Sequence, residues 1–128
     1  MPRPVAIKRD AGQEKAVADW IKAVVGEWPE DTLYEDVLKN GVLLCRFMNV
    51  LQPGSVTKIN TSGANFKLME NITKLHNAFL NYGVDQVDVF QTNDLFEKRD
   101  LGAVTNTMFA LDRAVGKHPE WTGARLQK

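Results

Sequence analysis

The sequence predicts an all-α fold of four main helices with short helical turns, one of the four being a central, buried helix. Apolar residues recur at spacings of three and four in several segments, as on the buried face of a helix. Capping residues, glycines and prolines stand at the ends of these segments. One ten-residue run is apolar nearly all round, which is typical of a helix enclosed by others. Connectors of up to a dozen residues favour a globule over a simple up-and-down bundle.

The first helix is predicted to begin after Asp10 and to end at Gly26. Gln13 stands three residues after Asp10, a pair that resembles a capping box. Four apolar residues then follow the i, i+3, i+4, i+7 spacing: Val17, Trp20, Ile21 and Val24. The segment is therefore an amphipathic helix with one core-facing stripe.

A second helical segment is predicted to start at Leu33 and to run to about Lys39. Its signal is the T-x-x-E capping box formed by Thr32 and Glu35, in which two side chains satisfy free backbone N–H groups at the helix start.

The Asn40-Gly41 pair that follows is a strong signal for a two-residue β-hairpin. The next residues, VLLCRFMNVL, show no alternation of apolar and polar side chains, so we reject the hairpin. We expect Asn40 to cap a new helix, the central buried one, which Pro53-Gly54 ends. One continuous helix from Leu33 through Gly41 stays open, at a cost of about 1 kcal/mol for glycine relative to alanine.

Two more long helices are predicted in the second half of the chain. Asn65 would cap the first, with Gly83 as its left-handed stop, and Asp100 would cap the second, which runs up to Gly116. A single helical turn is expected at Asp94–Glu97 between them. The two apolar stripes are Leu68, Ile72, Leu75, Phe79 and Tyr82, and then Leu101, Val104, Met108, Leu111 and Val115.

These elements define one domain at residues 13–116. Residues 1–12 are expected to be an N-terminal tail with the first helix cap. Residues 117–128, which include Pro119 and Gly123, are expected to be a C-terminal tail or linker.

Composition argues against several classes of partner. Sixteen basic and sixteen acidic residues give a formal net charge of zero, so we expect no nucleic-acid and no membrane partner. No apolar run approaches the roughly 20 residues of a membrane span, and the N-terminus does not resemble a signal peptide. Together with a single cysteine, these features predict a cytoplasmic protein. We expect it to be a monomer.

The sequence contains little that points to catalysis, and we expect no enzyme, no cofactor and no metal. Cys45 lies in the apolar run and is expected to be an inert, buried thiol. His76 is expected to be a partly buried, hydrogen-bonded side chain and not a catalytic base. One cysteine with His76 and His118 matches no metal-ligand spacing, and no phosphate-binding glycine loop is present.

Three stretches in register resemble the calponin-homology domain: LKNGVLLCRFMNVLQPGSVTKIN, FKLMENITKLHNAFLNYGV and VFQTNDLFEKRDLGAVTNTMFAL. The likeness is to the single-domain type found in calponins, transgelins and invertebrate muscle relatives, and it covers about Lys15 to Val115. It implies a calponin-homology fold of four main helices plus short ones. It also implies a cytoskeletal, muscle-type role in binding or organising filamentous actin.

Calponins and transgelins continue into short calponin-like repeats that carry much of their filament affinity, whereas this sequence stops at Lys128 without one. We therefore expect the domain alone to bind actin weakly. The alternative that the resemblance leaves open is a signalling or scaffolding adaptor, which would bind a kinase or cytoskeletal regulator with little affinity for actin.

Six basic side chains are the candidate partner-binding residues. They lie on or beside the first and last helices, the regions that contact actin in tandem relatives of the resembled family. A basic strip there would suit an acidic filament, although exposed charges are also the ordinary state of lysine and arginine. The residues are Lys15, Lys22, Lys98, Arg99, Arg113 and Lys117.

Overall fold

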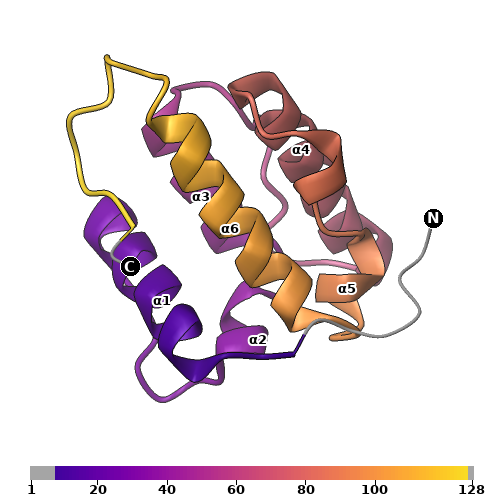
Figure 1. Cartoon of the computed structure of the whole chain (residues 1–128). Helices are drawn as coiled ribbons and strands as arrows, with labels where there is room; N and C mark the ends of the chain where they lie inside the picture. Colours follow the sequence, from indigo (N-terminus) through magenta and orange to yellow (C-terminus); the bar gives the residue numbers. More distant parts are fainter. Residues whose placement is uncertain (1–7, 127–128) are drawn as a thin grey trace.

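The computed structural model describes residues 8–126, which form helices, turns and loops without a β-strand. Among these residues, no helix combines the length and hydropathy that a membrane span needs. In chain order the helices are α1 (Ala11–Val25), α2 (Tyr34–Leu38), α3 (Val42–Leu51), α4 (Asn65–Tyr82), the 3-10 helix η1 (Gln86–Asp88), α5 (Thr92–Phe96) and α6 (Leu101–Val115) (Figure 1). The predicted all-α fold with four main helices is confirmed, the four being α1, α3, α4 and α6.

Helix α3 is the central element. It packs against α1, α2 and α4, and Figure 1 shows α1 and α4 on either side of it, with α6 in front. Arg46 and Val50, one turn apart, are its only exposed residues. The predicted central buried helix is therefore confirmed. Its buried residues are Val42, Leu43, Leu44, Cys45, Phe47, Met48 and Leu51.

The predicted apolar stripes of α1, α4 and α6 form the rest of the core. Val24 and Leu68 are only partly buried, at the edge of the cluster. The fully covered members are Val17, Trp20, Ile21, Ile72, Leu75, Phe79, Tyr82, Leu101, Val104, Met108, Leu111 and Val115. Helical spacing thus located the buried face of α1 and α4. Helix α6 is buried on nearly all sides, with Asn106 and Arg113 as its exposed residues, so its predicted stripe is only part of what it buries.

Helices α2 and α3 are separate, so the alternative of one continuous helix is wrong. Gly41 has a left-handed backbone (φ 76°), which breaks the helical path between them. The N-cap residue of α3 is Gly41 and not the predicted Asn40. Asn40 still contributes to the new start, because its side-chain oxygen accepts a hydrogen bond from the Val42 N–H at 3.0 Å. Gly41 also lies against α4: a Cβ atom here would come within 3.2 Å of the Asn71 Cβ and 3.3 Å of the Ile72 Cγ1.

Asn71 of α4 joins three segments of the chain from a fully buried position. Its side-chain nitrogen donates to the carbonyl oxygen of Asn40 at 3.0 Å and to that of Asn60 at 2.7 Å. Its side-chain oxygen accepts from the Asn60 N–H at 2.8 Å. The amide therefore ties the turn before α3 and the loop before α4 to α4 itself. Nothing in the sequence analysis anticipated this role.

The caps predicted at Asp10 and Asp100 are confirmed. Each carboxylate accepts a hydrogen bond from the backbone N–H three residues further on, at 2.9 Å and 3.0 Å respectively. Gly26 and Gly83 end α1 and α4 in the left-handed conformation, with φ of 93° and 118°.

The capping box predicted at Thr32 and Glu35 is wrong. Helix α2 begins at Tyr34, and its N-terminus has no side-chain cap. The Tyr34 side chain is buried, and its hydroxyl shares a hydrogen bond of 2.8 Å with Thr105 of α6, which sets the position of the helix start. The Glu35 carboxylate accepts instead from Arg9, at 3.0 Å.

Two other predicted starts are displaced. Asn65 is the first residue of α4 and not its cap, because the extended backbone of Ala64 precedes it. Helix α5 begins two residues before the predicted Asp94–Glu97 turn. Asp94 acts from inside that helix, where its carboxylate accepts from the Gln91 N–H at 2.8 Å.

Residues 117–126 lack helix and strand, but they fold back onto the domain (Figure 1, yellow). The indole N–H of Trp20 donates to the Ala124 carbonyl at 2.9 Å. Arg125 donates to the Asp112 carboxylate of α6 at 2.6 Å, and Leu126 is buried. The described part of the expected tail or linker is thus packed against α1 and α6.

Replacing Asn71 with alanine is expected to lower the free energy of unfolding by about 3 kcal/mol, because three partly buried backbone groups lose their partner. Asn77→Ala is the matched control, since Asn77 is an exposed asparagine of the same helix; its effect is expected to stay within about 0.5 kcal/mol. Urea unfolding followed by tryptophan fluorescence measures both values. Equal stability of the two variants would contradict the role assigned to Asn71.

Candidate partner-binding surface

The two predicted partner-binding residues of α1 are exposed and paired with carboxylates. Lys15 lies 2.8 Å from Asp19 and Lys22 lies 2.9 Å from Glu30. Both lysines line one shallow hollow beside Trp28. The ion pair with Glu30 raises the pKa of Lys22. Lysines paired in this way carry little net field toward a partner.

The other four predicted residues lie near the two ends of α6. Lys98 is paired with Asp36 of α2, and Arg99 lies 3.7 Å from Glu97. At the far end of the helix, Arg113 lies 3.9 Å from Asp88. Lys117 has no carboxylate within ion-pair distance among the described residues.

The six residues therefore do not form one strip. They lie in three separate groups of two: Lys15 with Lys22, Lys98 with Arg99, and Arg113 with Lys117. Helix α6 is 15 residues long, so the pairs at its two ends are separated by roughly 20 Å. Five of the six cations face a carboxylate of this same chain. Their part in partner binding stays a prediction.

A different group of cations lies around the start of α4. Lys58, Lys67 and Lys74 have no carboxylate within ion-pair distance in the described part of the chain. Phe66, on the first turn of α4, is 62% exposed. We name these four residues the basic-aromatic patch. The nearest acid in the sequence, Glu70, accepts a hydrogen bond of 3.2 Å from the Asn60 side chain.

The sequence carries a signal for this patch in its charge distribution and not in any motif. Between Asp36 and Asp85 the chain has one acidic residue, Glu70, and five lysines and arginines. Lys67 and Lys74 are also seven positions apart, which places them on the same face of a helix. A zero net charge for the whole chain therefore conceals a strong local imbalance.

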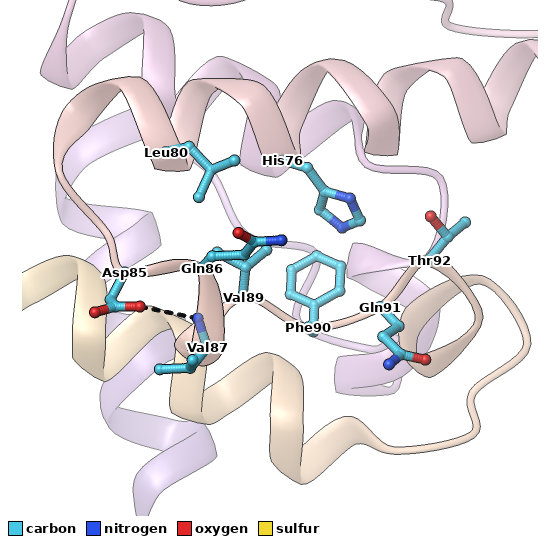
Figure 2. A pocket seen from close by; sticks show the side chains of 9 residues that line it. All are labelled: His76, Leu80, Asp85, Gln86, Val87, Val89, Phe90, Gln91 and Thr92. Carbon is cyan, nitrogen blue, oxygen red and sulfur yellow. Dashed lines mark hydrogen bonds between the residues drawn. The ribbon is translucent and has the colours of Figure 1, made fainter. Parts of the chain in front are cut away.

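A separate groove of about 740 Å³ lies between the second half of α4, η1 and the start of α5 (Figure 2). His76 points into it with its ring edge-on to Phe90, at a centroid distance of 5.1 Å. The Asp85 carboxylate accepts the Val87 N–H at 3.0 Å, and the Val87 side chain is 86% exposed. The remaining lining residues are Leu80, Gln86, Val89, Gln91 and Thr92.

The groove does not form an acid–base site. The Nε2 atom of His76 is buried without a hydrogen-bond partner in the described structure, so the prediction of a hydrogen-bonded histidine is wrong for this nitrogen. Burial lowers the pKa of His76, while the charge of Asp94 acts in the opposite direction. The imidazole is therefore neutral at physiological pH. The lining includes one hydroxyl, that of Thr92, and the Nε2 atom of His76 makes no hydrogen bond to it.

Cys45 lies in the core, away from solvent. Its side chain is fully buried, and its sulfur donates to the Asn71 carbonyl oxygen at 3.5 Å. Burial raises its pKa to about 12, so the thiol stays protonated at neutral pH. Within residues 8–126 no group of three metal-ligating side chains comes together.

The described residues thus form a packed helical core, and the exposed side chains are the ones available for contact with other molecules. A family model for the calponin homology (CH) domain matches residues 11–116. The chain belongs to the CH domain family. The resemblance found in the sequence is therefore confirmed.

The relatives include a protein named as muscle-specific and a calponin. Muscle-specific protein 20 of Drosophila melanogaster is 49% identical over 123 residues, which is 95% of this chain and 67% of that protein. Myophilin of Echinococcus granulosus is 48% identical, across 93% of this chain and 64% of its own length. Calponin-2 of Bos taurus is 40% identical, across 81% of this chain and 33% of its own length. The chain thus spans about two thirds of the first two proteins and one third of calponin-2.

Solved CH structures share the fold. The calponin-homology domain of Rng2 from Schizosaccharomyces pombe superposes with a TM-score of 0.77 at 25% identity, covering 91% of this chain and 73% of that one. Together, family and relatives support the non-enzymatic, actin-associated cytoskeletal role expected from the sequence. They do not favour the adaptor alternative.

The pKa of His76 predicts how stability depends on pH. Because the pKa in the folded state lies below the ordinary value of 6.5, the unfolded state takes up this proton first as the pH falls. The contribution of the neutral His76 to the free energy of unfolding is therefore complete above pH 6.5. It is lost as the pH falls through the folded-state pKa, by at most about 1.4 kcal/mol per pH unit. We expect His76→Gln to lose less stability than the wild type between about pH 6.5 and pH 5.

His118→Gln is the control for this measurement. The pKa of His118 is raised, first by its hydrogen bond to the Tyr82 carbonyl, so its contribution has the opposite sign and is lost as the pH rises. Urea unfolding at a series of pH values gives the three curves. A wild-type slope in the His76→Gln variant would contradict the assignment.

Proposed function

We propose that this chain is a non-enzymatic CH module that binds actin filaments and helps to organise them within a calponin-like muscle protein. The observation that carries the proposal is the 49% identity to Muscle-specific protein 20 across 95% of the chain. The identity extends over nearly the whole domain, which supports a role of the same kind. The proposed location is therefore the cytoskeleton.

The absence of catalysis in this proposal is supported by the positions of the reactive side chains. Cys45 is a protonated, buried thiol, and His76 is a neutral imidazole whose Nε2 atom has no hydrogen-bond partner among the described residues. The packed core leaves the exterior as the part of the described chain that meets other molecules. Binding, and not turnover, is the activity that this arrangement supports.

The proposal includes a single copy of the domain acting as a monomer with modest affinity. The six predicted residues, Lys15, Lys22, Lys98, Arg99, Arg113 and Lys117, remain candidates for filament contact because all are exposed. Five already have a carboxylate partner, so each is expected to add little affinity. This agrees with weak binding by the domain alone.

Cosedimentation with filamentous actin tests the proposal. The 128-residue chain is expected to pellet with filaments at low ionic strength and to pellet less as salt is added, because salt screens exposed charges. A spin without filaments controls for self-association. No filament-dependent pelleting at tens of micromolar protein would contradict the proposal and support an adaptor that contacts filaments hardly at all.

A further inference from the structure

The basic-aromatic patch differs from five of the six predicted partner-binding residues because its lysines form no ion pair with a carboxylate among the described residues. Lys58, Lys67 and Lys74 lack a carboxylate partner among the described residues, whereas Lys15, Lys22 and Lys98 each have one. A partner carboxylate that approaches a paired lysine must compete with the existing ion pair. At the patch no ion pair has to be broken first, so the patch is the stronger attractor of an acidic surface.

The loop that carries Lys58 is held in place before any partner arrives. Asn60 is bonded through both its N–H and its carbonyl to the buried side chain of Asn71. The Lys74 ammonium donates to the carbonyl oxygens of Thr57 and Lys58, at 3.0 Å each. Lys58 itself has a left-handed backbone with φ of 53°, a conformation that costs a lysine about 1 kcal/mol. The patch is thus preorganised, which lowers the entropy cost of binding.

The start of α4 adds to the positive potential. No side chain caps this helix, and its first turn contains no acidic residue. Its free N–H groups place the positive end of the helix dipole beside Lys67. Phe66 stands in the same turn and is 62% exposed. An exposed aromatic side chain among basic ones has the composition of an interface anchor.

We infer that the basic-aromatic patch is a docking surface for an acidic, partly apolar protein surface, and that this surface is the side of the actin filament. The inference rests on the proposed function for the identity of the partner. The lysines would meet carboxylates of the filament, and Phe66 would be covered by apolar atoms between them. This surface lies on α4 and the loop before it, apart from the six residues on and beside α1 and α6.

Paired charge-reversal variants test the electrostatic part. Lys58→Glu with Lys67→Glu is expected to weaken cosedimentation with actin at least about tenfold. Lys74 is left unchanged because it holds the loop. The matched control is Lys8→Glu with Lys39→Glu, two exposed cations outside the patch that also form no ion pair among the described residues and give the same change in net charge. The control is expected to pellet within about twofold of the wild type.

A second pair tests the aromatic anchor without changing charge. Phe66→Ala is expected to weaken pelleting about fivefold. Leu33→Ala is its control, because Leu33 is 64% exposed and therefore closely matches Phe66 in exposure. Circular dichroism and thermal unfolding establish that all four variants keep the wild-type fold.

The outcomes separate the two proposals. If the wild type does not pellet with filaments, the proposed function fails and this inference fails with it. If the wild type pellets and the Lys58/Lys67 variant pellets equally well, the inference alone is overturned. Equal losses in the patch variant and its charge-matched control would also overturn it, because the effect would then belong to net charge and not to this surface.

Discussion

The side chain of Asn71 and the backbone of Gly41 meet where α3 begins against α4, and the rest of the domain depends on this junction. Gly41 has no side chain to separate the two helices, so α3 starts in direct contact with α4. The buried amide of Asn71 then satisfies backbone groups of Asn40 and Asn60. A buried amide without these partners would be costly, so the arrangement specifies one position for each segment.

Two consequences follow from the junction. The first concerns the core, because the path of α3 between α1 and α4 buries Cys45 and its apolar neighbours. The second concerns the surface, because Asn60 is the fixed point of the loop that carries Lys58. The same interaction thus helps to bury the thiol of Cys45 in the core, and it holds the loop with Lys58 in place on the exterior. The junction therefore links the packing of the CH fold to the surface proposed to bind the actin filament.

Elements governed by local spacing could be predicted from the sequence. The stripes of the long helices were correct because a period of three to four residues is a property of each segment alone. Asp10 and Asp100 were correct as caps for the same reason, since each bonds to a backbone N–H only three residues away. The capping box predicted for α2 was wrong: no side chain caps the helix, and its first residue, Tyr34, bonds to Thr105, 71 positions along the chain.

Features that depend on contacts between distant segments could not be predicted. Asn71 directly precedes the core residue Ile72 and resembles a solvent-facing polar residue until the loop at Asn60 is folded over it. The ion pair of Lys98 with Asp36 joins residues 62 positions apart, so the sequence could not predict that the charge of Lys98 is neutralised. The basic-aromatic patch is the opposite case, because the scarcity of acids between Asp36 and Asp85 can be read directly from the sequence.

The free energies of unfolding of Gly41→Ala and Gly54→Ala test the junction most directly. Both glycines are left-handed, with φ of 76° and 84°, so alanine costs each about 1 kcal/mol in backbone strain. A Cβ at Gly54 meets nothing within 4 Å, whereas at Gly41 it is crowded by α4. We predict a loss of about 3 kcal/mol for Gly41→Ala and about 1 kcal/mol for Gly54→Ala. Equal losses would contradict the account.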